Sequence, residues 1–489
     1  MPGIGERARS TPDATAIVEG ASATTFAELD RRQRLLAGAF KAAGIGVRDR
    51  IAVYASNRRE LLEVTTGALR CAVVPVPVHA LLTPAEAAYI IEDSGARWLF
   101  TDRTIDHFPS LERVVTFGDA YERLLHESEP ATLADFMLGR PMHYTSGTTG
   151  APKGVWVDPV GDSKASGISD EFRRLWGLAD EDVHLVCSPL THSAPHRFAG
   201  RTLEAGGSVV VQPRFDPAET LAAIELYGIS TTFMVPTHLE RMLSLEKAAL
   251  RRHDLSTMRM LVHAGSPIRE ETKRKIIELF PLGSVWEFYG STEGQVTRIS
   301  PEEWLQKPGS VGKPTLGVRV SIVNDEGLEA APGEVGDIWV AYDSGERFSY
   351  WRDRRKTEAA WSDAMFTVGD RGWVDEDGYL FLAGRKNDMI ISGGINVYPQ
   401  EVESALVGHP AVEEAVVYGA PHPEWGQQVC ALVVPAYGQP LDPAALTVWL
   451  KERLAGYKCP RRIEVVDELP RTPTGKVKRP RPALPDESG

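Results

Sequence analysis

YTSGTTGAPKGV, at residues 144–155, is the most informative stretch of this 489-residue chain. Its glycines allow the backbone to turn tightly and to bring N–H groups close to an anion. Hydrogen-bond donors and a positive charge suited to a polyphosphate come from Thr145, Ser146, Thr148, Thr149 and Lys153. The spacing is not that of the Walker A motif, so a P-loop NTPase fold is not implied. A flexible polar surface turn has a similar composition, so the rest of the sequence must decide between the two interpretations.

Further motifs follow this stretch along the chain. They are YGSTE at 289–293, VGD at 368–370, GRKND at 384–388, SGGINVYP at 392–399 and PRTPTGK at 470–476. Together, and in this order, the segments resemble the motifs of the acyl-adenylate-forming superfamily, which includes acyl-CoA synthetases, luciferases and peptide-synthetase adenylation domains. Val368 departs from the threonine of the family's T-G-D motif. The position that resembles the family hinge is Asn387, where Asp or Lys is common, so rates of domain rotation cannot be carried over.

The resemblance implies an AMP-forming acyl-CoA synthetase similar to fatty-acid–CoA ligases. Such an enzyme uses ATP and magnesium to convert a carboxylic acid into an acyl-adenylate, which then reacts with coenzyme A. A carboxylate must approach a triphosphate, and two like charges about 4 Å apart repel by about 4 kcal/mol at an effective dielectric of about 20. The site must therefore supply positive charge. Lys476 resembles the family's catalytic lysine. Charge alone would favour a solvated basic tail, and the T-G-K context reverses that preference.

The resemblance also assigns the nucleotide-binding residues. By this resemblance, Glu293 and Thr145 are expected to bind magnesium, and Thr292 is expected to bind the α-phosphate. The loop that contains Gly147 is expected to bind the β- and γ-phosphates. Asp370 is expected to bind the ribose, and Arg385 to add positive charge near the ribose and phosphate. The adenine is expected between the turn Ala264-Gly265-Ser266 and the segment Glu287-Phe288-Tyr289-Gly290, with Tyr289 stacked on the ring. Two alternatives stay open at this point: Tyr289 as an ordinary core residue, and Asp370 as a surface ion pair with Arg371.

The acid is expected to bind among residues after Pro189, around Val235–Pro236 and near His263–Ala264. His192 lies in a segment that resembles the family's P-L-x-H. It could gate the pocket or contact the carboxylate, or it could be an ordinary buried, hydrogen-bonded histidine. Peptide-synthetase domains carry an Asp near this region, and none stands between Ser188 and Gly200, which argues against an α-amino acid. A medium-chain or aromatic acid is preferred.

Coenzyme A is the expected acceptor. The Gly393-Gly394 loop would form the thiol channel, and Lys458, Arg461 and Arg462 would face the phosphates, unless these basic residues are simply solvated surface. A carrier-protein thiol, an amine, or an oxidative, luciferase-like use of the adenylate remain as alternatives. A catalytically inactive binding module would be expected to lack Lys476 or Glu293, and both are present.

Alternation of apolar and polar residues predicts an α/β fold with largely parallel sheets. Helices are expected at 26–43, from 58, and at 83–92, 216–227 and 270–279; strands are expected at 51–54, 72–77, 97–101, 209–212, 231–235 and 260–263. Thr25 and Glu28 fit a capping box. The sequence predicts a large multi-sheet N-terminal domain over residues 1–383 and a small mobile α+β domain over 384–489. In that second domain, helices are expected at 399–406 and 443–454 and strands at 412–418 and 429–434.

The overall composition excludes several other functions. The net charge of −13 argues against a general nucleic-acid binder. The N-terminus lacks the apolar segment of a secretory signal, and no apolar run is long enough to span a membrane. The four cysteines stand far apart, without metal-ligand spacing. A cytoplasmic protein with reduced thiols is expected, and the oligomeric state is left open.

Overall fold

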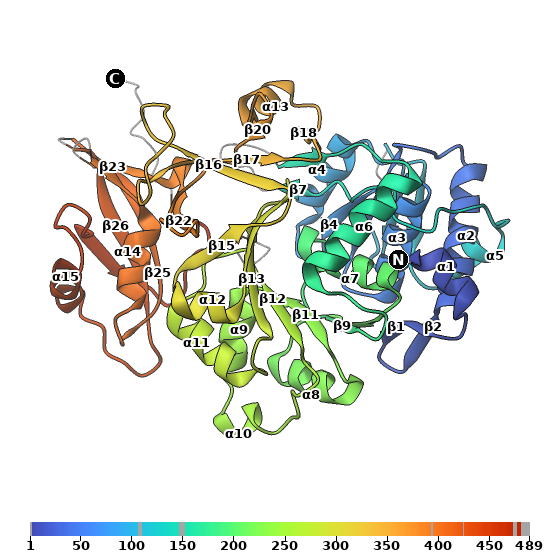
Figure 1. The fold of residues 1–489 in the computed structure, drawn as a ribbon, viewed down its shortest axis with the longest axis horizontal. Coiled ribbons are helices and arrows are strands. Elements are labelled where there is room, and N and C mark those ends of the chain that lie inside the picture. Colours follow the sequence, from blue (N-terminus) through green and yellow to red (C-terminus); the bar gives the residue numbers. More distant parts are fainter. Residues whose placement is uncertain are drawn as a thin grey trace. The chain divides into compact units, whose positions relative to one another are not determined.

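The computed structural model describes residues 2–105, 110–145, 152–392, 395–423, 425–472 and 477–480. By compactness the chain divides into two units (Figure 1). The N-terminal unit runs to residue 308 and includes 314–317 and 343–360, and the remaining residues form the C-terminal unit. Compactness thus groups 361–383 with the C-terminal part. The predicted domain boundary between residues 383 and 384 is the position about which the C-terminal domain is expected to rotate. The division by compactness does not test it, so it stays a prediction.

The largest sheet of the N-terminal unit has the strand order β14-β13-β12-β11-β9-β10-β1-β2. Neighbouring strands are parallel from β13 to β1, whereas the pairs β13–β14 and β1–β2 are antiparallel. The strands are β1 (Thr15–Glu19), β2 (Ser22–Thr25), β9 (Val183–Val186), β10 (Ser208–Val211), β11 (Thr231–Met234), β12 (Met260–His263), β13 (Val285–Gly290) and β14 (Gln295–Ile299). The parallel α/β architecture predicted from the sequence is therefore confirmed.

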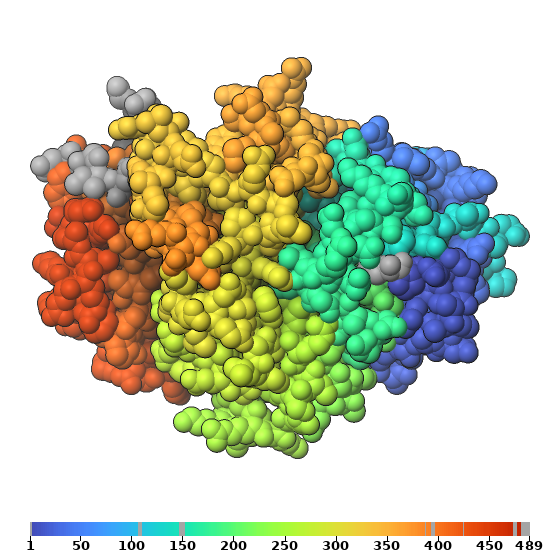
Figure 2. All heavy atoms as spheres, viewed as in Figure 1, coloured from blue at the N-terminus to red at the C-terminus, as the bar shows by residue number. Residues whose placement is uncertain are grey.

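Helices connect these parallel strands, as crossover connections require. They are α7 (Ser193–Ala205), α8 (Pro217–Tyr227), α9 (Pro236–Leu243), α10 (Lys247–Leu250) and α11 (Glu270–Leu279). In addition, α6 (Asp162–Trp176) precedes β9 and α12 (Pro301–Gln306) follows β14. The space-filling view shows α10 in light green on the surface, and none of its residues is buried (Figure 2). In the part of the chain that the structure describes, no helix has the length and apolar character needed to cross a lipid bilayer.

Two smaller sheets complete the N-terminal unit. One is entirely parallel, in the order β4-β3-β5-β6, and the other has the order β18-β8-β7. Their strands are β3 (Arg50–Ala55), β4 (Val74–His79), β5 (Trp98–Thr101), β6 (Arg113–Thr116), β7 (Tyr144–Thr145), β8 (Lys153–Trp156) and β18 (Ser349–Tyr350). The accompanying helices are α1 (Gly3–Ser10), α2 (Phe26–Ala42), α3 (Arg59–Arg70), α4 (Pro84–Ser94), α5 (Asp119–His126) and α13 (Arg354–Ala360).

The N-terminus of α2 corrects one expectation. Thr25 Oγ1 accepts a hydrogen bond from the Glu28 N–H at 3.2 Å, which is the first half of the predicted capping box. The Glu28 carboxylate instead pairs with the guanidinium of Arg31, at 2.8 Å. A complete box forms at the start of α4, where Thr83 and Glu86 exchange both hydrogen bonds. At α2, the nearby cation competes successfully for the carboxylate.

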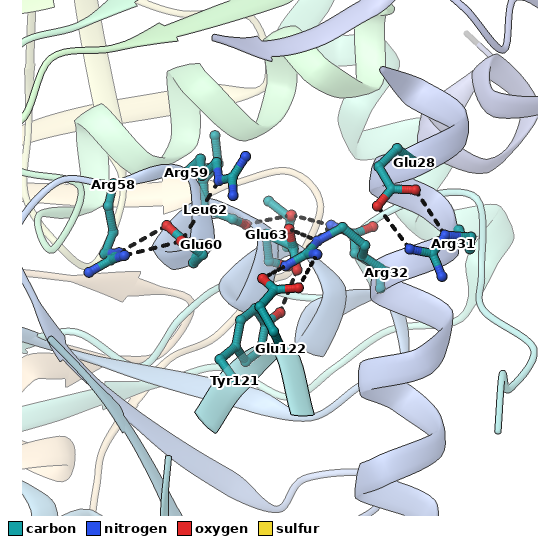
Figure 3. A network of polar contacts seen from close by, with 12 residues as sticks. Glu28, Arg31, Arg32, Arg58, Arg59, Glu60, Leu62, Glu63, Tyr121 and Glu122 are labelled. Carbon is teal, nitrogen blue, oxygen red and sulfur yellow. Dashed lines mark hydrogen bonds and ion pairs between the residues drawn. The ribbon is translucent and has the colours of Figure 1, made fainter. Parts of the chain in front are cut away.

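A buried polar network joins α2, α3 and α5 (Figure 3). At its centre is Glu63, which is 2% exposed. It accepts hydrogen bonds from Arg32 Nε at 2.8 Å and from the Tyr121 hydroxyl at 2.5 Å, and Arg32 also binds Glu122. Burial raises the pKa of the Glu63 carboxyl group, and the Arg32 guanidinium opposes this rise. A buried charge requires such partners, so the network fixes how the three helices pack.

The described residues of the C-terminal unit form two sheets. The first has the order β19-β20-β17-β21-β22-β15, with β16 also paired to β17, and the second has the order β24-β23-β26-β25, with β27 paired to β26. The first sheet consists of β15 (Ser310–Pro314), β16 (Val318–Val323), β17 (Gly336–Tyr342), β19 (Trp361–Ser362), β20 (Met365–Phe366), β21 (Asp370–Val374) and β22 (Leu380–Arg385). The second consists of β23 (Ile390–Ser392), β24 (Ile395–Val397), β25 (Val412–His422), β26 (Gly426–Pro435) and β27 (Arg462–Val465).

Two helices cover the second sheet and form its core: α14 (Pro399–Val407) and α15 (Pro443–Lys451). Val402 and Leu406 of α14 and Leu446 and Leu450 of α15 are fully buried. A short 3₁₀ helix (Lys386–Asp388) lies between the two sheets in sequence and contains the predicted hinge position. The helices and strands predicted for this part of the chain are confirmed, with β25 and β26 longer than expected and α15 ending at Lys451 instead of residue 454.

Candidate functional site

A small antiparallel sheet flanks the predicted phosphate loop in sequence. Thr145 of β7 pairs with Lys153 of β8, and its hydroxyl donates to the Lys153 carbonyl oxygen at 3.5 Å. The Lys153 ammonium group lies 4.0 Å from the Asp353 carboxylate, and its side chain is 24% exposed. The structure thus brings Thr145 and Lys153 together. Ser146, Gly147, Thr148 and Thr149 lie outside the described residues.

Glu293, the predicted magnesium ligand, is tied to this small sheet through Tyr350. The Tyr350 hydroxyl donates to Glu293 Oε1 at 2.8 Å, and Tyr350 pairs with Val155 of β8 in the sheet. Glu293 is 6% exposed, and Arg140 Nη1 donates to its carbonyl oxygen at 3.0 Å. Sequence analysis missed Tyr350 and Arg140, because neither belongs to a recognisable motif. The arrangement links the carboxylate to the strand that carries Lys153.

The single carboxylate of Glu293 suits a magnesium ion that also binds substrate phosphates. It does not suit a metal ion held by protein side chains alone. Within the described ranges, no three His, Cys, Asp or Glu side chains converge to hold a metal ion. Magnesium usually binds through one or two carboxylates together with substrate phosphates. Glu293, close in the fold to the strands that flank the predicted phosphate loop, fits that requirement.

Tyr350→Phe is expected to raise the magnesium concentration needed for half-maximal activity roughly tenfold, because it removes a hydrogen bond that orients a charged group. The ring is kept, so packing should change little. Magnesium titration of AMP formation measures the effect, with Tyr437→Phe as the control, since Tyr437 is fully exposed. If the KM for the acid rose by the same factor as the magnesium requirement, Tyr350 would not act on Glu293 alone, which would contradict the prediction.

The predicted adenine-binding residues come together at one edge of the large sheet. Met234, His263 and Glu287 are neighbours in register on β11, β12 and β13. Because these strands are parallel, their carboxyl ends meet at the same edge, where α/β proteins bind ligands. Beyond β12, Gly265 has a φ of +96°, which forms the turn at 264–266. Tyr289 lies on the neighbouring strand and is 8% exposed, so its stacking role stays a prediction.

An aromatic cluster adjoins the predicted acid pocket. The rings of Phe198, Phe233 and Phe288 lie 6.0 to 6.4 Å apart, and all three are buried. Three residues from the predicted lining segments, Ala194, Val235 and Ala264, pack into this same cluster. The structure therefore joins the three segments in an apolar, aromatic environment.

Two histidines of the predicted pocket segment have different surroundings. His192 precedes α7, is half-buried, and lies with its ring 5.1 Å from that of His79. His196 is buried, and its Nε2 hydrogen-bonds to Thr65 at 2.8 Å, so His196 is the ordinary core histidine of the pair. Burial lowers the pKa of His79 and of His196 to about 4 each, so both are neutral near pH 7. The role of His192 stays a prediction.

In the C-terminal unit, the predicted ribose residues are paired with each other. Asp370 and Arg385 are opposite one another on β21 and β22, and Arg385 Nε donates to Asp370 Oδ1 at 3.1 Å. Arg371 is 1% exposed and binds Asp325 at 2.7 Å. The alternating strand directs the side chain of Arg371 into the protein, so the ion pair that the structure shows for Asp370 is the one with Arg385. The ribose role of Asp370 stays a prediction.

Lys476 lies outside the described residues, as do Gly393 and Gly394, and described residues on both sides of Lys476 have defined partners. Arg471 and Val477 form an antiparallel bridge, and Arg479 Nη1 donates to Glu403 of α14 at 2.6 Å. Lys458, a predicted coenzyme A contact, pairs with both carboxylate oxygens of Glu401, and Arg462 pairs with Glu464. The aromatic ring of Trp425 lies 5.1 Å from the Arg461 guanidinium.

Comparison with known proteins gives consistent matches. The family model described as AMP-binding enzyme matches residues 4–345, and that of the AMP-binding enzyme C-terminal domain matches residues 401–476. A fatty acid–[acyl-carrier-protein] ligase, ScoC, of Streptomyces coeruleorubidus is 33% identical over 96% of this chain and 93% of its own length. A feruloyl-CoA synthase of an Amycolatopsis species is 34% identical over 96% of each protein.

The fold also matches solved structures. O-succinylbenzoate CoA synthetase (MenE) of Bacillus subtilis, in complex with its acyl-adenylate intermediate, superposes with a TM-score of 0.84 at 30% identity, covering 97% of this chain and 96% of that one. The same protein has been solved with ATP and a magnesium ion. The similarity extends over both the large N-terminal part and the smaller C-terminal part.

Proposed function

The chain belongs to the AMP-binding enzyme family, and from this membership we infer that it is an AMP-forming carboxylic acid–CoA ligase. The observation that carries the inference is the connection of Glu293, through Tyr350, to the strand pair that holds Thr145 and Lys153. A buried carboxylate connected to the strand pair that carries Thr145 and Lys153 is suited to magnesium and a polyphosphate.

In the first half-reaction, a carboxylate oxygen of the acid attacks the α-phosphorus of ATP, and pyrophosphate leaves with the electron pair of the broken P–O bond. Thr145, Lys153 and the loop between them would hold the departing phosphates, and Thr292 the α-phosphate. Magnesium, when bound at Glu293, supplies positive charge to the phosphate oxygens. Lys476 would offset the charge that gathers between the carboxylate and the α-phosphate.

In the second half-reaction, the thiolate of coenzyme A attacks the acyl carbon, and AMP leaves. The segment that contains Gly393 and Gly394 would admit the thiol. Lys458, Arg461 and Arg462 would contact the phosphates of coenzyme A after exchanging their present partners. Because one C-terminal segment carries Lys476 and another carries these glycines, we propose that the C-terminal domain alternates between the two steps, with Asn387 at the hinge.

The acid proposed is compact and aryl-containing. Aromatic side chains of Phe198, Phe233 and Phe288 pack against residues from all three predicted pocket segments, and such a wall favours a flat apolar group. Two of the proteins compared above are named for aryl acids, ferulate and succinylbenzoate. A medium-chain fatty acid passed to a carrier protein is the second candidate, supported by the similarity to ScoC.

The test is incubation with ATP, magnesium and a panel of aryl, fatty and amino acids, with either coenzyme A or a phosphopantetheinyl carrier protein. Mass spectrometry then follows AMP and thioester. AMP together with an acyl-CoA from an aryl acid supports the proposal. Thioester on the carrier protein alone favours the second candidate, and AMP formation without any thioester would show that the true acceptor is another nucleophile, such as an amine.

Asp370→Ala is expected to raise the KM for ATP roughly tenfold to a hundredfold, because hydrogen bonds from the ribose to a charged acceptor are lost. The KM for the acid should stay nearly constant. Steady-state kinetics with each substrate varied in turn measures both values, and Glu376→Ala provides a matched exposed carboxylate nearby. Equal changes in the two KM values would count against the ribose role.

A further inference from the structure

An arginine outside the recognised motifs contacts the turn that carries the predicted magnesium ligand. Arg140 Nη1 donates to the carbonyl oxygen of Glu293 at 3.0 Å and, more weakly, to that of Thr292 at 3.5 Å. These two residues are the predicted ligands of magnesium and of the α-phosphate. One guanidinium group therefore binds the main chain of both, and the sequence motifs do not account for it.

The turn leaves these two carbonyl oxygens without strand partners. The Ser291 N–H donates to the Gly294 carbonyl oxygen at 2.8 Å, which closes the connection between the antiparallel strands β13 and β14. Thr292 and Glu293 lie between these two residues, beyond the paired positions of either strand. Among the described residues, the hydrogen bonds to their carbonyl oxygens come from Arg140. The planar guanidinium group, with several N–H donors, is suited to serving two acceptors at once.

The segment that contains Arg140 is itself held by main-chain hydrogen bonds. The Leu138 N–H donates to the Leu69 carbonyl oxygen at 3.0 Å, and the Met142 N–H donates to the Pro75 carbonyl oxygen at 2.9 Å. The strand β7, which leads into the predicted phosphate loop, begins two residues after Met142. Arg140 therefore connects the chain on this side of the loop to the turn with the predicted magnesium ligand.

Glu293 is restrained at both its side chain and its main chain. The Tyr350 hydroxyl binds one carboxylate oxygen at 2.8 Å, and Arg140 binds the carbonyl oxygen. A ligand that is fixed before the ion arrives loses less conformational entropy on binding, and the charged groups need little reorganisation. The two restraints thus prepare the carboxylate for magnesium.

Arg140 does not belong to a hydrogen-bonded ion pair with a carboxylate. Its Nη2 atom is buried and has no hydrogen-bond partner among the residues that the structure describes. The Glu346 carboxylate lies 3.9 Å from this atom, beyond hydrogen-bond distance. A buried donor without a partner is costly, so an arginine that served packing alone would be poorly placed here. Within the described ranges, the hydrogen bonds that Arg140 makes both go to the turn.

We propose that Arg140 is a positioning residue for the magnesium–nucleotide complex, which fixes the main chain of Thr292 and Glu293 beside the strand that leads into the phosphate loop. It acts through Glu293, so its contribution to ATP affinity requires magnesium. Without the ion, the Glu293 carboxylate repels the triphosphate, and a better-placed carboxylate gives no gain. The proposal rests on the nucleotide chemistry of the proposed function and adds a residue that belongs to none of its motifs.

Calorimetric binding of ATP with and without magnesium tests the proposal, without any acid or catalytic step. The magnesium-dependent gain in affinity is expected to fall about tenfold in Arg140→Met, the factor that one hydrogen bond involving a charged group is worth. Affinity for ATP in EDTA should stay nearly constant. Arg174→Met, which removes an exposed arginine of α6, is the control and should keep the gain. In a Glu293→Gln background, Arg140→Met should have little further effect, because the carboxylate through which it acts is gone.

An undiminished gain in folded Arg140→Met would overturn the proposal, as would equal losses with and without magnesium or a full effect in the Glu293→Gln background. If Arg140→Met does not fold, as judged by circular dichroism, Arg140→Lys decides. It keeps the charge but lacks the planar fork, so it should lose part of the gain, and full retention would overturn the proposal. Magnesium-dependent ATP binding without acyl-adenylate formation from any acid would refute the proposed ligase function and leave the role of Arg140 standing.

Discussion

Replacing Lys476 with alanine is expected to lower the rate of acyl-adenylate formation by a factor on the order of 10² to 10³, the usual effect of removing one preorganised electrostatic group. The step brings a carboxylate against a triphosphate, so charge accumulates where the lysine is expected to act. Thioester formation from a preformed acyl-adenylate should be nearly unaffected, because that step begins from a neutral mixed anhydride carbonyl and needs a different segment of the chain.

Two assays separate the half-reactions. Exchange of labelled pyrophosphate into ATP reports the first, and release of AMP from synthetic acyl-adenylate with coenzyme A reports the second. Lys478→Ala is the matched control, since it removes an exposed positive charge two residues away. Loss of both half-reactions in a folded Lys476→Ala variant would contradict the division of labour, as would an equal effect of Lys478→Ala.

The described residues that flank Lys476 in the sequence are bonded to one another. The bridge between Arg471 and Val477 and the hydrogen bond from the Lys478 N–H to the Pro470 carbonyl oxygen, at 2.6 Å, hold the two chain segments beside each other. Arg479 anchors the same region to α14. Because the residues on both sides of Lys476 are ordered, less conformational entropy would be lost when the lysine binds its substrate.

Arg32→Leu is expected to lower the free energy of unfolding by about 3 to 5 kcal/mol, the usual cost of leaving one partner of a buried ion pair uncompensated. Glu63 is 2% exposed and, among the residues that the structure describes, would keep the hydroxyl of Tyr121 as its one side-chain partner (Figure 3). Urea unfolding followed by circular dichroism measures the change. Arg31→Leu is the control, because its pair with Glu28 is largely exposed and should contribute less than about 1 kcal/mol.

The pH dependence of the Arg32→Leu variant gives an independent check. Burial raises the pKa of Glu63 in the folded protein, so the folded state binds a proton more readily than the unfolded state. Stability attributable to this group is therefore greater at pH values below its unfolded pKa and is lost as pH rises through its folded pKa. The penalty should shrink as pH falls, and Glu63→Gln in the same variant should remove most of it. A penalty independent of pH would point to lost packing by the arginine stem.

The local sequence was a good guide wherever one segment carries the whole signal. The strands β11 and β12 and the helices α8 and α11 were predicted because their apolar periodicity is contained within a few residues. The capping interaction at Thr25 shows the limit, since Glu28 was recognised as a capping residue but binds Arg31 instead. Competition between two nearby partners depends on side-chain geometry, which a four-residue pattern does not contain.

By itself, the sequence determined the class of fold, the order of the nucleotide motifs and the family. Each of these follows from short patterns of neighbouring residues. Only the tertiary structure decided which partners support those motifs. Tyr350 reaches Glu293 across 57 residues, Arg32 reaches Glu63 across 31, and Lys273 meets Glu287 from a different element. None of these pairs follows from periodicity or spacing. They exist because burying a charged group requires a partner of the right chemistry at hydrogen-bond distance, and the packing of helices against strands determines which distant residue meets that requirement.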